Sequence, residues 1–179
     1  MVVKKLQKNE GFTLIELLIV VAIIGIIAAI AVPGLLRARM SGNETSAIGG
    51  LRAVNTSQIN YSSACGMGAY ATDLTILARG PQNDTTNPFL SNDLTASATP
   101  QKSGFDYAMV PGMNSAAGPV SCNMDVTDVT FYATATPASV GGTGSRAFAT
   151  SQAGAIWQDT SGVPPAEPFT AGGNISPIQ

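Results

Sequence analysis

The chain has 179 residues, of which 45% are hydrophobic and 11% charged, and its formal net charge at pH 7 is −2. It contains no histidine, the usual general base and the commonest metal ligand, and no phosphate-binding loop, zinc spacing or EF-hand pattern. Together with the scarcity of basic residues, these features argue against an enzyme, a protein with a cofactor or metal, and a nucleic-acid-binding protein.

Residues 1–11 form a short basic leader that contains three lysines. A basic start before an apolar run is also typical of a secretory signal peptide, but such a peptide ends in a small-residue cleavage site after the run. Here only Ala29 and Ala31 offer a weak site of that kind. The lysines predict a cytoplasmic N-terminus with the rest of the chain outside, although Arg37 and Arg39 beyond the run favour the opposite orientation.

An apolar run follows the leader, and the twenty residues 17–36 carry no charge. A helix of that length spans about 30 Å, the thickness of the hydrocarbon core of a bilayer. The run has no polar face, which disfavours the alternative of a core helix in a soluble domain. Glu16 directly precedes the uncharged residues. An ionisable group at the edge of a membrane span is a functional candidate, unless it only reaches the lipid headgroups.

Residues 11–39 closely resemble the N-terminus of type IV prepilins and type II secretion pseudopilins, beginning with the sequence GFTLIE. The resemblance implies that a prepilin peptidase cuts between Gly11 and Phe12 and that Phe12 becomes the N-methylated residue. It also implies that Glu16 is the assembly glutamate and Pro33 the helix-interrupting proline. We therefore expect a subunit that is processed at the inner membrane, with its N-terminus cytoplasmic, before it assembles.

Assembly of such helices into a bundle gives Glu16 a physical role. The carboxylate of one subunit would meet the terminal ammonium of Phe12 in its neighbour, which would offset the cost of burying both charges and fix the register of the helices. The expected partners are other copies of this chain in a filament, the prepilin peptidase, the membrane, and an inner-membrane assembly platform with a separate ATPase. We expect Glu16→Ala to leave processing intact and to abolish assembly.

A second helical segment is predicted for residues 37–64, after Pro33 and Gly34, which should break or kink the helix. Apolar residues recur there at steps of three and four and mark one face of an amphipathic helix that would pack on a sheet. The stripe comprises Ala47, Ile48, Leu51, Val54, Gln58 and Tyr61. The predicted organisation is a leader at 1–11, a transmembrane and assembly helix at 12–36, the amphipathic helix at 37–64, and a globular head at 65–179.

Short strands joined by turns are predicted within the head, after a glycine-rich turn and a polar surface loop at residues 79–101. The strands are expected at residues 105–110, 126–136, 146–150 and 155–158, and the chain after Gly162 is expected to be irregular. One long helix over an antiparallel meander predicts an α+β fold of the pilin-like kind.

Two cysteines, Cys65 and Cys122, lie in this head. Outside the cytoplasm an even pair predicts a disulfide, which would close a loop of 57 residues and contribute about 4 kcal/mol in the chain-entropy model. Two free buried thiols are the alternative. Asp125 and Asp128 are interpreted as part of a solvated surface rather than a calcium site.

The sequence thus predicts a structural subunit of a type IV pilus-like filament. A type II secretion pseudopilin shares the whole N-terminal pattern, so a periplasmic pseudopilus is the first alternative to a cell-surface pilus. A monomeric, membrane-anchored binding module is the second. That module would need neither Glu16 nor a free Phe12 terminus, whereas the polymer needs both.

Overall fold

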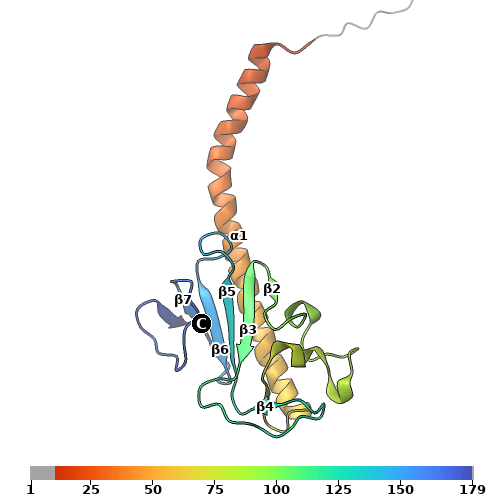
Figure 1. The fold of residues 1–179 in the computed structure, drawn as a ribbon. Helices are drawn as coiled ribbons and strands as arrows, with labels where there is room; N and C mark the ends of the chain where they lie inside the picture. Colours follow the sequence, from red (N-terminus) through yellow and green to blue (C-terminus); the bar gives the residue numbers. More distant parts are fainter. Residues whose placement is uncertain (1–10, 179) are drawn as a thin grey trace, which may run out of the picture. The chain divides into compact units, whose positions relative to one another are not determined.

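The computed structural model describes residues 11–178, so the predicted leader lies outside the described residues except for Gly11. The chain divides into two compact units at Ala38–Arg39. We call the described residues up to Ala38 the N-terminal unit and those from Arg39 onward the C-terminal unit. One continuous helix, α1 (Leu14–Ala64), supplies all the regular structure of the first unit and the start of the second (Figure 1).

The end of α1 is set by the turn that follows it. The amide of Gly66 donates to Tyr61 O (2.7 Å) and that of Gly68 to Ser62 O (2.9 Å), which satisfies carbonyl groups of the last helical turn. Gly68 has φ of +94°, a conformation that side chains disfavour. The chain then enters β1 (Tyr70–Ala71) and the short 3-10 helix η1 (Leu74–Ala78).

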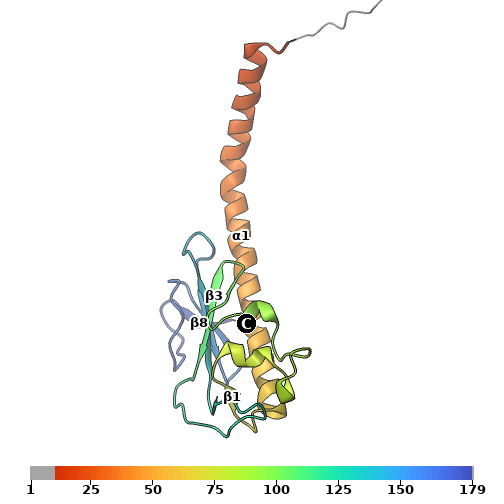
Figure 2. The same cartoon turned by 45° about the vertical axis from the view of Figure 1, so that its right-hand side comes forward.

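Two antiparallel sheets make up the rest of the C-terminal unit. The larger has six strands in the order β2-β3-β5-β6-β7-β8, and the smaller pairs β1 with β4. Figures 1 and 2 show the larger sheet lying along the C-terminal part of α1. The strands are β2 (Gln101–Lys102), β3 (Phe105–Val110), β4 (Thr127–Asp128), β5 (Tyr132–Pro137), β6 (Ala147–Ser151), β7 (Ile156–Asp159) and β8 (Ile175–Pro177). This confirms the predicted α+β fold.

The core lies between α1 and the sheet. The predicted apolar stripe is buried except for Ile48, which is half-buried. From the sheet, β3 contributes Phe105, Tyr107 and Met109 on alternate positions, as expected for a strand with one buried face. The predicted packing of this apolar stripe on a sheet is therefore confirmed.

The single strand predicted for residues 126–136 is wrong. The chain forms β4 and β5 there, in different sheets, because Asp128 turns it between them. The Oδ1 atom of Asp128 accepts hydrogen bonds from the Thr130 amide (3.0 Å) and hydroxyl (3.1 Å), a local side-chain turn that competes with continued strand pairing.

Two predicted irregular segments carry more structure than expected. The loop at residues 79–101 contains the 3-10 helices η2 (Pro81–Asn83) and η3 (Asn92–Leu94), and it buries Leu90 and Leu94 in the core. The tail after Gly162 returns to the sheet as β8, which pairs with β7. The expectations of a pure surface loop and of a wholly irregular tail are therefore corrected.

Candidate assembly segment and disulfide-linked turn

The first turn of α1 is closed by a reciprocal pair of side chains. The Thr13 amide donates to Glu16 Oε2 (2.9 Å), and the Glu16 amide donates to Thr13 Oγ1 (3.2 Å). The Thr13 hydroxyl also donates to the Glu16 carboxylate (2.7 Å). This is a capping box, in which two otherwise unpaired helix donors are satisfied. Within the N-terminal unit, Glu16 thus acts as a helix cap, a role that the threonine three residues earlier already indicates in the sequence.

Gly11 and Phe12 precede this cap in a non-helical segment, and both are exposed, with Phe12 at 89%. The apolar side chains that follow are exposed as well. None of the large apolar side chains between Leu14 and Leu36 is less than 46% exposed. This part of α1 is long and apolar enough to cross a membrane, and it buries nothing in the described structure. A core helix of a soluble domain would be covered, so that alternative does not fit.

Pro33 and Gly34 lie inside α1, which continues through them. The predicted break of the helix at this point is therefore wrong, and a kink stays a prediction. Gly34 is exposed, and a Cβ atom there would meet nothing within 4 Å. Both residues belong to the N-terminal unit, and Pro33 has no backbone N–H to donate within the helix.

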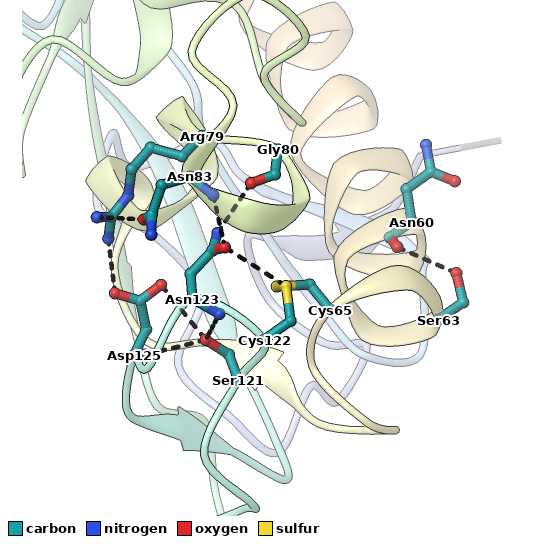
Figure 3. The surroundings of a disulfide bond; sticks show 10 residues. All are labelled: Asn60, Ser63, Cys65, Arg79, Gly80, Asn83, Ser121, Cys122, Asn123 and Asp125. Atoms are coloured by element: carbon teal, nitrogen blue, oxygen red, sulfur yellow. Dashed lines mark hydrogen bonds and ion pairs between the residues drawn. A yellow bond between two sulfur atoms is a disulfide. The ribbon is translucent and has the colours of Figure 1, made fainter.

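The two cysteines form a disulfide, so the alternative of free thiols is excluded (Figure 3). Cys65 follows the last residue of α1, and its Cα atom is 4.8 Å from that of Cys122. The Cys122 amide also donates to the Cys65 carbonyl (2.8 Å). The end of the helix is thereby tied, by one covalent and one hydrogen bond, to the loop that leads to β4.

A polar network surrounds this disulfide (Figure 3). The Asn123 side chain donates to Gly80 O (2.9 Å) and accepts from the Asn83 amide (2.8 Å), while Arg79 pairs with Asp125 at 2.6 Å. These contacts fasten the segment at residues 79–83 onto the disulfide-bonded loop. Together they explain why a polar, turn-rich sequence is ordered here.

The interpretation of Asp125 and Asp128 as solvated surface is wrong. Asp125 is held by Arg79, and its side chain is 14% exposed. Asp128 is buried and accepts hydrogen bonds from the Ser115 hydroxyl (2.6 Å) and the Ala116 amide (3.3 Å). In the part of the chain that the structure describes, no group of three or more potential metal ligands occurs.

Glu44 is a structural residue that the sequence analysis missed. It lies on α1 in the C-terminal unit, is 5% exposed, and accepts bonds from the amides of Ser145 (2.8 Å) and Arg146 (3.1 Å). Its other oxygen pairs with the Arg146 guanidinium through Nε (2.9 Å) and Nη2 (2.7 Å). The sequence signal was present: Glu44 lies three residues before Ala47, in phase with the buried stripe.

Three comparisons bear on these features. A family model of the prokaryotic N-terminal methylation motif matches residues 6–32. The chain is 48% identical over 56 residues to the type IV major pilin protein PilA of Myxococcus xanthus, and 58% identical over 40 residues to the type IV wide pilus major component PilA4 of Thermus thermophilus. These alignments cover 31% and 22% of this chain, and only 26% and 30% of the two relatives. No solved structure matches.

Proposed function

We propose that the chain, which belongs to the type IV pilin family by its N-terminal segment, is a structural subunit of a type IV pilus-like filament. The observation that carries the proposal is the exposed apolar surface of the N-terminal unit, which lies largely within the residues that match the methylation motif and includes the helix-capping Glu16 near its start. Such a surface requires cover by a bilayer or by other copies of itself.

The proposed processing site is the bond between Gly11 and Phe12. Both residues are exposed and non-helical, so the backbone is open to a peptidase at the start of α1. Gly11 lacks a side chain, and apart from its chain neighbours no described residue lies within 4 Å of where its Cβ atom would stand. Prepilin peptidase would cut here and N-methylate Phe12, and the product would wait in the inner membrane with the C-terminal unit outside the cytoplasm.

The proposed assembly contact joins Glu16 of one copy to the Phe12 ammonium of another. Glu16 already accepts from the Thr13 amide, yet a carboxylate has lone pairs for further donors, so capping its own helix does not exhaust it. In a bundle of apolar helices both charges would be desolvated, and each would need the other. A separate ATPase on a membrane platform would supply the energy for assembly.

Two substitutions separate capping from assembly. Thr13→Ala removes the threonine half of the capping box but keeps the carboxylate, whereas Glu16→Ala removes the carboxylate and leaves the Thr13 hydroxyl to accept from the amide of residue 16. We expect sheared filaments from the Thr13→Ala cells and none from the Glu16→Ala cells, while both strains accumulate a chain that begins at Phe12. Normal filaments from Glu16→Ala would overturn the assembly role and would favour a monomeric membrane-anchored binding module.

Intact mass of sheared filaments and of membranes tests the function itself. A chain that starts at methylated Phe12 and is a main component of the sheared fraction identifies a pilus subunit. The same processed chain confined to membranes, in cells that shed other pili, would instead identify a pseudopilin of a type II secretion system. A chain beginning at Met1 in both fractions would contradict processing altogether.

A further inference from the structure

An aromatic groove with one charged residue lies on the C-terminal unit. It has a volume of about 400 Å³, and its walls include Trp157, Phe169 and Glu167. The rings of Trp157 and Phe169 stack with their centroids 5.5 Å apart, and the centroid of the Tyr132 ring is 6.1 Å from that of Phe169. A second hollow of about 340 Å³ shares Met113 and Glu167 with it. We call the two together the Glu167 groove.

The chemistry of the Glu167 groove favours a cation. Among the described residues, Glu167 is the only charged side chain that lines either hollow. Its Oε2 atom accepts from the Met113 amide (2.6 Å), which holds the carboxylate in place, and no hydrogen bond to its Oε1 atom occurs within residues 11–178. Burial, together with the negative charge of Glu167, raises the pKa of Tyr132 to about 12. Aromatic faces beside a carboxylate suit a planar guanidinium, which stacks and hydrogen-bonds at once.

The basic side chains that form no ion pair among the described residues indicate which cation could bind in the groove. Within the described residues the other basic side chains, Arg79, Lys102 and Arg146, each form an ion pair. No ion pair is found there for the three exposed arginines of α1, which are Arg37, Arg39 and Arg52. The basic residues left over are thus on the helix, and Glu167 is on the sheet side of the unit.

Arg39 and the groove lie at opposite ends of the C-terminal unit. Glu44 bonds Ser145 and Arg146 just before β6, and Asn55 bonds Thr150 (2.9 Å) and Gly154 (3.0 Å) at its end, so α1 and β6 run side by side in the same direction. The groove lies at that end of β6, since its lining includes Ser151, Gln152 and Tyr132, which pairs with Ser151. Arg39 precedes Asn55 by sixteen residues, or about 24 Å along a helix.

We infer that Arg39 of one copy of this chain binds in the Glu167 groove of another. The two surfaces differ and lie at opposite ends of the unit, so the contact is head-to-tail, and repeating it builds an open helical polymer rather than a closed dimer. The inference rests on the proposed filament, and it names a contact between C-terminal units that is separate from the Glu16 contact.

Zero-length cross-linking tests the contact directly. In filaments of the Arg39→Lys variant, a carbodiimide should join the new amine to the Glu167 carboxylate and give covalent dimers and higher ladders. We expect at least tenfold more dimer than in Arg52→Lys filaments, the matched control on the same helix, and none of the joined peptide in the Arg39→Lys/Glu167→Gln variant. Filaments that form normally but lack this peptide would overturn the inference and leave the pilus assignment intact.

Charge reversal gives an independent measurement. Arg39→Glu should lower the yield of sheared filaments at least tenfold, Arg52→Glu should stay within twofold of wild type, and Arg39→Glu combined with Glu167→Arg should restore the yield. An unchanged yield for Arg39→Glu would contradict the contact. Wild-type cells whose sheared material lacks the processed chain would overturn the proposed function instead, and the inference with it.

Discussion

Glu44 is a buried charge at a core position of α1, and its value to the fold depends on its partners. Its carboxylate accepts five hydrogen bonds from Ser145 and Arg146, which offset the loss of hydration. Glu44→Ala removes the carboxylate partner of Arg146, which still donates to Gln158 Oε1 (2.7 Å), and takes the acceptor of two amides away. We expect the free energy of unfolding to fall by about 3 kcal/mol, the lower end of the range for buried pairs, because Arg146 is 36% exposed.

Urea unfolding of the full chain in detergent measures this change, with the fluorescence of Trp157, the single tryptophan, as the probe. Arg52→Ala is the control, since Arg52 is exposed on the same helix, and it should change stability by less than about 0.5 kcal/mol. Equal effects of the two substitutions would show that Glu44 does not anchor the sheet to the helix.

The same residue makes stability sensitive to acid. Burial alone would raise the pKa of Glu44, but the hydrogen bonds from Arg146 and Ser145 and the charge of Arg146 outweigh it, so the pKa is lowered from 4.5. A carboxyl group with a lower pKa in the folded state stabilises above its unfolded value and loses that contribution as pH falls through the folded value. We expect stability to decline below about pH 4.5, and less steeply in Glu44→Gln. If the stability of the wild-type protein and that of the Glu44→Gln variant fall equally with pH, Glu44 is not the source of the acid sensitivity.

At the scale of elements, α1 packs against the Tyr107 side chain of β3 at a glycine, Gly50. A Cβ atom on Gly50 would lie 2.5 Å from Tyr107 Oη and 2.8 Å from its Cε1 atom, and the Tyr107 ring is only 1% exposed. Gly50→Ala should therefore destabilise the unit by about 1–3 kcal/mol through overpacking. Gly49 has open space beside it, so Gly49→Ala should stabilise the helix by up to about 1 kcal/mol. Urea midpoints of the two variants that shift in the same direction would contradict this packing.

The disulfide joins two elements that are otherwise distant in sequence. Cys65 and Cys122 are 57 residues apart, and closing such a loop in the unfolded chain is worth about 4 kcal/mol in the chain-entropy model. We expect Cys65→Ser/Cys122→Ser to lower the free energy of unfolding by roughly that amount. Reduced wild type is the matched control and should unfold at the same urea concentration. A double variant as stable as the oxidised protein would mean that the polar contacts around Arg79 and Asn123 alone hold the turn.

Sequence patterns predicted the helices and strands that are determined by neighbouring residues along the chain. The bounds of β3 agree with the alternation at residues 105–110, and the buried face of α1 follows from its apolar repeat. The capping box was not predicted, although the threonine three residues before Glu16 is a local signal for it. The division between β4 and β5 was missed because the alternation at residues 126–136 fits one continuous strand. The Asp128–Thr130 turn that divides it is local, but Asp128 is also held by Ser115 and Ala116, which belong to a separate segment. The return of the tail as β8 is a tertiary pairing of the same kind.

Across the whole molecule, α1 serves two environments. In the C-terminal unit its apolar face is buried by the sheet, whereas in the N-terminal unit the apolar residues face outward on every side. Hydrophobic surface of that extent is stable only where lipid or other apolar helices exclude water. In the proposed pilus this hydrophobic surface is covered first by the lipid of the inner membrane and then by other apolar helices in the filament interior.

Filaments held together by buried apolar helices should stay intact in high salt and dissociate in detergent. At 1 M NaCl the Debye length is about 3 Å, which weakens exposed charge pairs such as the inferred contact of Arg39 with Glu167 but leaves apolar burial unscreened. We expect sheared filaments to remain sedimentable in 1 M NaCl and to release monomers when heated in an ionic detergent, which covers the apolar helices in place of neighbouring copies. Sedimentation followed by gel analysis of the pellet and supernatant distinguishes intact filaments from released monomers. Release of most of the chain by NaCl alone would mean that polar contacts, and not the N-terminal helices, hold the copies together.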